Sequence, residues 1–294
     1  MIRVFAAATA LGGILHDPAT GATHRHPDRR PGAHHAGRQT LDDRTLPAGA
    51  IDVERPIPVS VRWSLGVPTS SISSREHDWH RTAGILADAG VLGVEIRGGD
   101  PILLNGLPAV AQRIIAGGRA VVSVTAPGWH LHGRAEQLAG AVDAVRITLD
   151  ERTAADPHRR AGNLTLTTGA IRDAVAAGLP VHLHSRTTAT RDRVQALIDL
   201  AAQTGAGELT PLPPVTGHTG GTGHDILSDD ELVRALDLPA GFRLHLHTGT
   251  RLASVTVIAD DHVRRIDTGG AAVIRSRPLR SVADLLPEDV DAHA

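Results

Sequence analysis

Apolar and polar residues alternate along several short stretches between residues 57 and 247, and a segment long enough for a helix follows each stretch except the last. A period of two is typical of a strand, whereas an apolar side that recurs every three to four residues is typical of a helix. The predicted strands are 57–65, 94–97, 120–125, 144–149, 180–184, 207–212 and 242–247. The predicted helices are 75–89, 107–116, 134–140, 168–177, 191–204 and 228–236.

This alternation of strands and helices predicts right-handed βαβ units and a parallel sheet. The fold class is therefore α/β, a partial (β/α)6-type, TIM-like barrel over residues 56–247. Residues 248–294 form a small C-terminal extension, with a hairpin of 255–258 and 262–266. Residues 1–26 are interpreted as a hairpin, because no signal-peptide cleavage site follows the apolar stretch 4–15. The Pro- and Gly-rich segment 27–55 is interpreted as a flexible linker.

One face of these predicted strands is polar, although parallel strands are normally apolar on both faces. The residues on this face are Ser60, Arg62, Ser64, Glu95, Arg97, Ser123, Thr125, Arg146, Thr148, Asp150, His182, His184, Arg243, His245 and His247. Buried charges need a partner, water or a ligand. We therefore expect Glu95 and Asp150 to pair with arginines, and the lumen to admit a polar ligand at the carboxyl ends of the strands.

Composition excludes several functions. The chain has no cysteine, so it can form no disulfide and can supply no thiolate to an iron–sulfur cluster. It also has no lysine, which excludes a P-loop lysine and a lysine Schiff base. The use of arginine in place of lysine is typical of a GC-rich bacterium. A net charge of −2 favours neither nucleic acid nor an anionic membrane as partner. No apolar run approaches the roughly 18 residues of a membrane span, so we expect a cytoplasmic protein.

A glycine turn follows the strand 94–97. Gly98 and Gly99 allow a sharp bend and the close approach of a ligand, and Asp100 can accept hydrogen bonds from an ammonium group. A tight βα turn without any ligand explains the same residues. The two interpretations differ in what Asp100 contacts.

The strand that ends in Gly-Gly-Asp-Pro resembles the amino-group motif of radical S-adenosylmethionine enzymes, in which glutamate is the usual acid. Residues 142–150 resemble their fourth strand, and 177–181 resemble the entry into strand five. Residues 158–162 resemble a His-x-x-Arg-x-Gly turn, although the arginine and the glycine here fall one place early. The similarity spans roughly residues 56–286 and favours the peptide-modifying group with C-terminal extensions of the SPASM/twitch type. It implies that Gly98, Gly99 and Asp100 bind S-adenosylmethionine. The rest of the implied cofactor site is Thr125, Arg146, Thr148, Asp150 and Arg160, with Arg146 or Arg160 on the carboxylate.

The chain departs from this family at the loop after the first strand, where the family carries three cysteines spaced C-x-x-x-C-x-x-C. Residues 66–74 place serines there instead: Ser70, Ser71, Ser73 and Ser74. Neutral hydroxyls are poor cluster ligands. The chain is therefore interpreted as a degenerate member without a 4Fe-4S cluster, in which reductive cleavage of S-adenosylmethionine is not expected.

Three functions stay open. The first is binding of S-adenosylmethionine or another polar ligand, in non-radical modification of a peptide or natural product. The second is a catalytically inactive pseudoenzyme that binds a peptide or an active partner enzyme. The third is a metal-dependent barrel enzyme, because two His-Leu-His strands and Asp150 offer ligands to zinc, iron or manganese. The expected metal ligands are His182, His184, His245 and His247.

Overall fold

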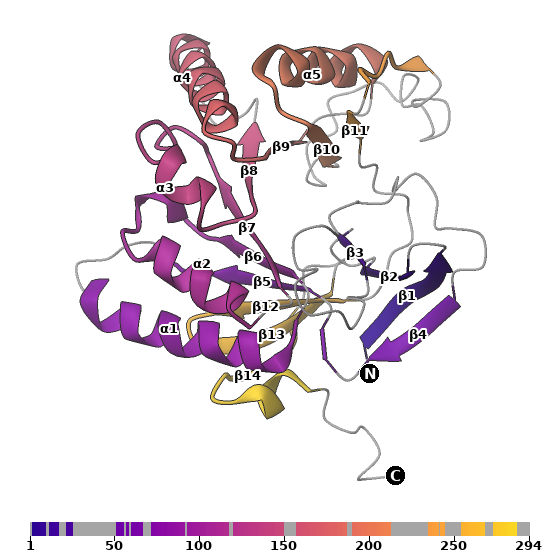
Figure 1. Cartoon of the computed structure of the whole chain (residues 1–294), viewed down its shortest axis with the longest axis vertical. Coiled ribbons are helices and arrows are strands. Elements are labelled where there is room, and N and C mark those ends of the chain that lie inside the picture. The colour runs from indigo at the N-terminus through magenta and orange to yellow at the C-terminus, as the bar shows by residue number, and fades with distance from the viewer. Residues whose placement is uncertain are drawn as a thin grey trace. The chain divides into compact units, whose positions relative to one another are not determined.

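The computed structural model describes residues 2–9, 12–17, 22–25, 51–55, 57–58, 60–66, 72–91, 93–117, 120–149, 157–186, 190–212, 235–240, 242–244, 254–267 and 273–286 (Figure 1). The chain divides into two compact units. The first unit consists of Met1–Val124 and Thr250–Ala294, and the second of Thr125–Gly249.

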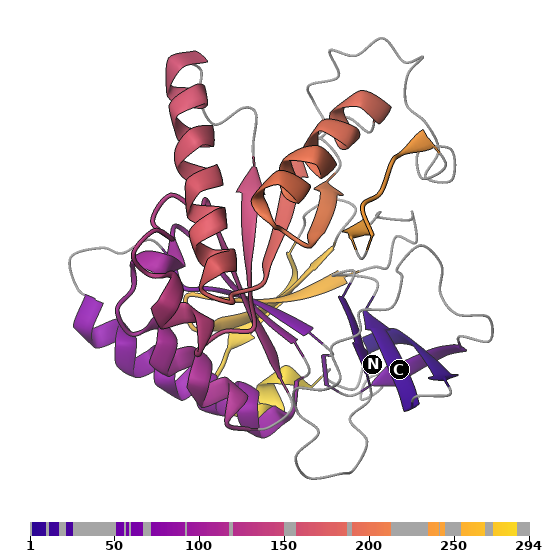
Figure 2. The same ribbon diagram turned by 45° about the horizontal axis from the view of Figure 1, so that its top comes forward.

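The first unit contains a small antiparallel sheet of β1 (Ile2–Thr9), β2 (Gly12–Asp17), β3 (Ala22–Arg25) and β4 (Ile51–Arg55), drawn in indigo and, for β4, in purple in Figure 2. Its order is β3-β2-β1-β4. The predicted hairpin is confirmed as β2 and β3. The linker prediction is wrong for residues 51–55, which pair with β1. Ile51 and Val53 alternate with Asp52 and Glu54, a strand pattern that is short enough to be hidden beside a Pro- and Gly-rich segment.

A second sheet of the first unit joins segments from both ends of the chain. Strands β5 (Ser60–Ser64), β6 (Gly93–Arg97) and β7 (Val121–Ala126) are parallel. β12 (Ser254–Ala259) lies parallel to β5 on its other side, as Figure 2 shows for the gold and purple strands. β13 (His262–Asp267) and β14 (Val273–Pro278) continue the sheet antiparallel. The C-terminal extension is therefore built directly onto the first strand of the β/α series.

The predicted hairpin of the extension is confirmed as β12 and β13. Asp260 and Asp261 form its two-residue turn, both with positive φ, at 50° and 56°. Tight hairpin turns need this left-handed backbone, and aspartate tolerates it better than most residues. β14 was not predicted. A 3-10 helix, η2 (Val282–Leu285), follows β14.

Helices α1 (Ile72–Ala89) and α2 (Leu107–Ile115) lie side by side in the first unit (Figure 1). The core of this unit consists of the apolar faces of its strands and helices, among them Val61, Trp63, Leu86, Val94, Ile96, Ile114, Val122 and Val124. α1 begins earlier than predicted, so that Ser73 and Ser74 lie in its first turn and not in the loop after β5.

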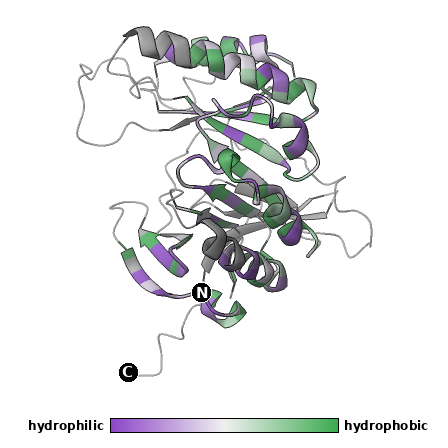
Figure 3. Cartoon of the chain, turned by 90° about the vertical axis from the view of Figure 1, so that its left-hand side faces the viewer, coloured by the Kyte–Doolittle hydropathy of each residue, from purple (hydrophilic) through white to green (hydrophobic). Residues whose placement is uncertain are grey.

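The second unit contains β8 (Ala144–Leu149), β9 (Val181–Arg186), β10 (Glu208–Leu212) and β11 (Arg243–Leu244), all parallel. Its helices are α3 (Ala135–Ala139), α4 (Pro157–Ala176) and α5 (Arg191–Thr204). Buried residues include Val145, Ile147, Ile171, Leu183, Ile198 and Leu209. Apolar (green) and polar (purple) residues follow one another along the strands and helices that Figure 3 draws in colour.

α4 begins eleven residues before its predicted start, so the predicted turn at 158–162 is helical. Proline is favoured in the first turn of a helix, which explains a start at Pro157, and Gly162 weakens the sequence signal of the helix. The predicted helix 228–236 lies almost wholly outside the described residues. The α/β class and the parallel strands are confirmed, in agreement with a partial barrel. Among the helices described here, none is long and apolar enough to cross a membrane.

Candidate functional site

The glycine turn after β6 packs against the end of β5. The Leu65 amide donates to the Arg97 carbonyl at 2.9 Å, which extends the β5–β6 pairing up to the turn. Gly98 and Gly99 have φ of 98° and 61°. A Cβ atom on Gly98 would lie 2.4 Å from Ser64 Oγ, so a side chain there would collide with the neighbouring strand. The fold itself therefore requires glycine at position 98.

Asp100 caps the short helix η1 (Pro101–Leu103). Its Oδ1 accepts a hydrogen bond from the Ile102 amide at 3.2 Å, and its carbonyl accepts one from the Leu103 amide at 3.1 Å. The sequence signal for this cap is an aspartate directly before a proline. Aspartate is preferred at the N-cap of a helix, and proline is preferred at the first helical position. The cap therefore holds the carboxylate directly after the glycine turn.

Charged side chains pair along the polar face of the first unit. Arg62 on β5 and Glu95 on β6 are register partners, and Arg62 Nε lies 3.3 Å from Glu95 Oε2. The Glu95 side chain is only 12% exposed and that of Arg62 is 26% exposed. On β7, buried Ser123 is the register partner of Glu95. The predicted pairing of Glu95 with Arg62 is confirmed, and it places a charge pair where a packed core would be apolar.

The contact between Arg62 and Glu95 is an ion pair and not a hydrogen bond. Arg62 Nε is buried and forms no hydrogen bond within the described part of the chain. A buried N–H group without an acceptor costs free energy, which is offset here by the opposite charge at 3.3 Å. The pair therefore holds the guanidinium in place through its charge.

The polar face of the second unit carries a row of charged register partners. The row begins with Arg146 on β8, which is the register partner of His182 on β9. His182 is in turn the partner of Glu208 on β10, and Glu208 that of Arg243 on β11. His182 Nδ1 is 3.3 Å from Glu208 Oε2, and the two side chains are 22% and 12% exposed. A carboxylate at Nδ1 orients an imidazole so that Nε2 can accept a proton or bind a metal. Glu208 was not among the predicted site residues, although it stands at the start of a predicted strand.

The remaining predicted site residues divide into three groups. Thr125, Arg146, Thr148 and His184 lie on strands, half-buried. Arg160 lies on α4, and Ser73 and Ser74 lie on α1. The third group lies outside the described residues and consists of Asp150, Ser70, Ser71, His245 and His247.

The predicted metal site is tested only in part. Within the described ranges, no three His, Asp or Glu side chains gather as metal ligands. Two of the four predicted ligands, His245 and His247, are not among these residues. The metal site therefore stays a prediction.

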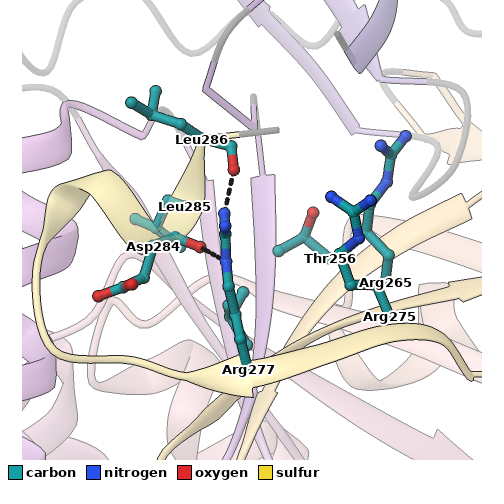
Figure 4. A pocket seen from close by; sticks show the side chains of 8 residues that line it. Thr256, Arg265, Arg275, Arg277, Asp284, Leu285 and Leu286 are labelled. Atoms are coloured by element: carbon teal, nitrogen blue, oxygen red, sulfur yellow. Dashed lines mark hydrogen bonds between the residues drawn. The ribbon is translucent and has the colours of Figure 1, made fainter. Parts of the chain in front are cut away.

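A small pocket lies on the C-terminal extension, between β12, β13, β14 and η2 (Figure 4). Its lining residues are Thr256, Val263, Arg265, Arg275, Arg277, Asp284, Leu285 and Leu286. The arginines come from two neighbouring antiparallel strands. None of these residues was among the predicted site residues.

No protein-family model and no curated protein matches the chain. Among solved structures, SuiB of Streptococcus suis matches 79% of this chain and 66% of its own, with a TM-score of 0.44 and 11% identity. SuiB bound to S-adenosylmethionine matches 72% and 63%, with a TM-score of 0.43 and 10% identity. Phospho-2-dehydro-3-deoxyheptonate aldolase of Thermotoga maritima matches 70% and 56%, with a TM-score of 0.36 and 15% identity. The chain thus spans slightly less than two thirds of SuiB.

Proposed function

We propose that this chain is a cysteine-free relative of the radical S-adenosylmethionine proteins that binds a charged, polar ligand, S-adenosylmethionine being the first candidate. It would act in peptide or natural-product modification without radical chemistry. The observation that carries the proposal is the ion pair of Arg62 and Glu95 on the polar face of β5 and β6, next to the turn of Gly98, Gly99 and Asp100. Calorimetric titration of the full chain with S-adenosylmethionine tests it, and measurable binding is expected.

The residues of the chain do not fit the iron–sulfur cluster of that family, because no cysteine thiolate is present. We expect anaerobic reconstitution with iron and sulfide to leave the purified protein with far less than one cluster per chain. Iron and sulfide analysis, together with the visible absorption spectrum, measures this. Stoichiometric cluster would contradict the proposal and would restore radical chemistry.

The residues around Asp100 do fit the ammonium group of S-adenosylmethionine. A half-buried carboxylate and the carbonyl groups of a glycine turn are acceptors, and an ammonium group has three donors and no acceptor. Bound S-adenosylmethionine would supply an electrophilic sulfonium. The role of Asp100 would be to hold the amino group while it caps η1.

The ion pair of the polar face should contribute to stability. Glu95→Gln keeps the size of the side chain but leaves Arg62 without the opposite charge. Removing one partner of a fully buried pair costs about 3–5 kcal/mol, and we expect about 1–3 kcal/mol here because Arg62 is 26% exposed. Urea unfolding measures the free energy of unfolding.

Asp78→Asn is the matched control for Glu95→Gln. Asp78 pairs with Arg81 at 3.6 Å on the surface of α1, where the side chains are 43% and 40% exposed. Exposed pairs contribute roughly 0–1 kcal/mol. An equal loss of stability in the two variants would show that the pair on the polar face is no more than a surface contact.

A metal-dependent activity is the second candidate, and the contact of His182 with Glu208 favours it. A carboxylate behind an imidazole is the usual support of a metal-ligating histidine. We expect wild-type protein loaded with zinc or manganese to retain the metal and His184→Ala to lose most of it. Elemental analysis after gel filtration decides, with exposed His80→Ala as the control. Equal metal content in wild type and His184→Ala would remove this candidate.

A further inference from the structure

Leu103 is a large apolar side chain that the fold leaves 49% exposed. Its neighbours in and after η1 are buried, namely Pro101, Ile102 and Leu104. Within the described part of the first unit, Val273 is the one other large apolar side chain that is exposed. The exposure of Leu103 therefore sets it apart from the rest of the turn and η1.

The local structure fixes the outward direction of Leu103. The Asp100 carboxylate caps η1 through the Ile102 amide, and the Leu103 amide donates to the Asp100 carbonyl at 3.1 Å. Ile102 and Leu104, on either side of Leu103, are buried. Turning Leu103 inward would bring these two apolar side chains into water, which costs free energy. The outward position is therefore a property of η1 as a whole.

Leu103 also lies next to Asp100. Asp100 is the N-cap of η1, and Leu103 is its third residue. In a capping box the side chain of the third residue lies back against the N-cap. The chain shows this geometry in η2, where the Asp284 carboxylate accepts hydrogen bonds from the Ser281 amide at 2.8 Å and from the Ser281 hydroxyl at 3.2 Å. The corresponding position in η1 places Leu103 beside the capping carboxylate.

This arrangement presents an apolar surface beside a carboxylate, directly after the exposed Gly99. It lies past the carboxyl end of β6, which is the edge of a parallel sheet at which ligands bind in this class of fold. Three residues of a 3-10 helix span roughly 6 Å. The methionine part of S-adenosylmethionine has an amino group and an apolar chain of similar length. A ligand whose ammonium group meets Asp100 would therefore bring this chain to Leu103.

We propose that Leu103 contacts the apolar chain of the methionine part of S-adenosylmethionine. The inference rests on the proposed binding of that ligand at Asp100. The contact removes apolar surface of both the leucine and the ligand from water, which favours binding. Asp100 then recognises the charge of the amino group, and Leu103 determines specificity for an apolar chain next to it.

Leu103→Gln tests the inference, because glutamine has a similar size but a polar end. Calorimetry of the full chain should show that this variant binds S-adenosylmethionine about three- to tenfold more weakly than wild type, as expected for the loss of an apolar contact over half a leucine side chain. Leu103→Met keeps an apolar side chain and should bind within about twofold of wild type. Far-UV circular dichroism confirms that the variants are folded.

Val273→Thr is the matched control. It makes another exposed apolar side chain polar, on β14, which β5, β12 and β13 separate from β6 in the sheet. This variant should bind S-adenosylmethionine as wild type does. Adenosine lacks the methionine part, so wild type and Leu103→Gln should bind it equally.

Three results would contradict the inference. Equal affinity of wild type and Leu103→Gln for S-adenosylmethionine would overturn it and leave the proposed function standing. An equal loss of affinity for adenosine would place Leu103 against the nucleoside and not against the methionine chain. Absence of S-adenosylmethionine binding by the folded wild-type protein would reject the proposed function together with the inference.

Discussion

Gly98→Ala should destabilise the protein by about 2–5 kcal/mol. Two effects act at this position. Alanine at a φ of 98° is strained by roughly 1–2 kcal/mol, and its Cβ would lie 2.4 Å from Ser64 Oγ. The backbone amides of Leu65 and Gly66 lie 3.3 and 3.2 Å from the same Cβ, so the chain cannot simply move aside. Urea unfolding measures the loss.

Gly133→Ala separates the two effects. Gly133 has a φ of 75°, but nothing lies within 4 Å of a Cβ added there. This variant should therefore lose only the roughly 1–2 kcal/mol of backbone strain. Ser64→Ala combined with Gly98→Ala should recover part of the loss, because it removes the nearest atom. If Gly98→Ala lowers the free energy of unfolding no more than Gly133→Ala does, the turn does not pack closely against β5.

Asp100→Asn should weaken S-adenosylmethionine binding roughly ten- to a hundredfold, which corresponds to the 1.5–3 kcal/mol of a hydrogen bond to a charged group. Asparagine caps a helix as well as aspartate does, so the free energy of unfolding should stay close to that of wild type. Asp100→Ala should lose the same affinity and in addition about 0.5–2 kcal/mol of stability, because it removes the cap on Ile102.

The pair of variants distinguishes a ligand contact from a structural role. If only stability changes, and only in Asp100→Ala, then Asp100 is a helix cap and the ligand binds elsewhere. If Asp100→Asn alone reduces affinity at unchanged stability, the carboxylate charge meets the ligand. Calorimetry and urea unfolding on the same protein samples give both quantities.

Sequence patterning predicted the parallel strands well, because each polar face alternates with an apolar face along several consecutive strands. It predicted the ion pair of Arg62 and Glu95 for the same reason, since neighbouring parallel strands bring their polar faces together. It missed β4 and the early start of α4. In both places proline and glycine, which usually mark loops, stand beside or inside the element.

The local roles of the site residues were harder to predict. The glycine turn was recognised, but its collision partner Ser64 becomes apparent only when β5 and β6 are aligned. Glu208 was missed because its significance depends on its register with His182 two elements earlier. The arginine pocket depends on β14, a strand that patterning did not predict, and on the register of Arg265 with Arg275.

Side-by-side calorimetric titration of the wild-type chain with S-adenosylmethionine and with 5′-methylthioadenosine tests the proposed function most directly. The second compound keeps the adenosine but lacks the α-amino and carboxylate groups of the methionine part and the positive charge of its sulfonium. If the turn at Asp100 binds the amino group, S-adenosylmethionine should bind at least tenfold more tightly than 5′-methylthioadenosine. Absence of heat with millimolar S-adenosylmethionine, in protein shown to be folded, would contradict the account and would leave a pseudoenzyme that acts through a partner.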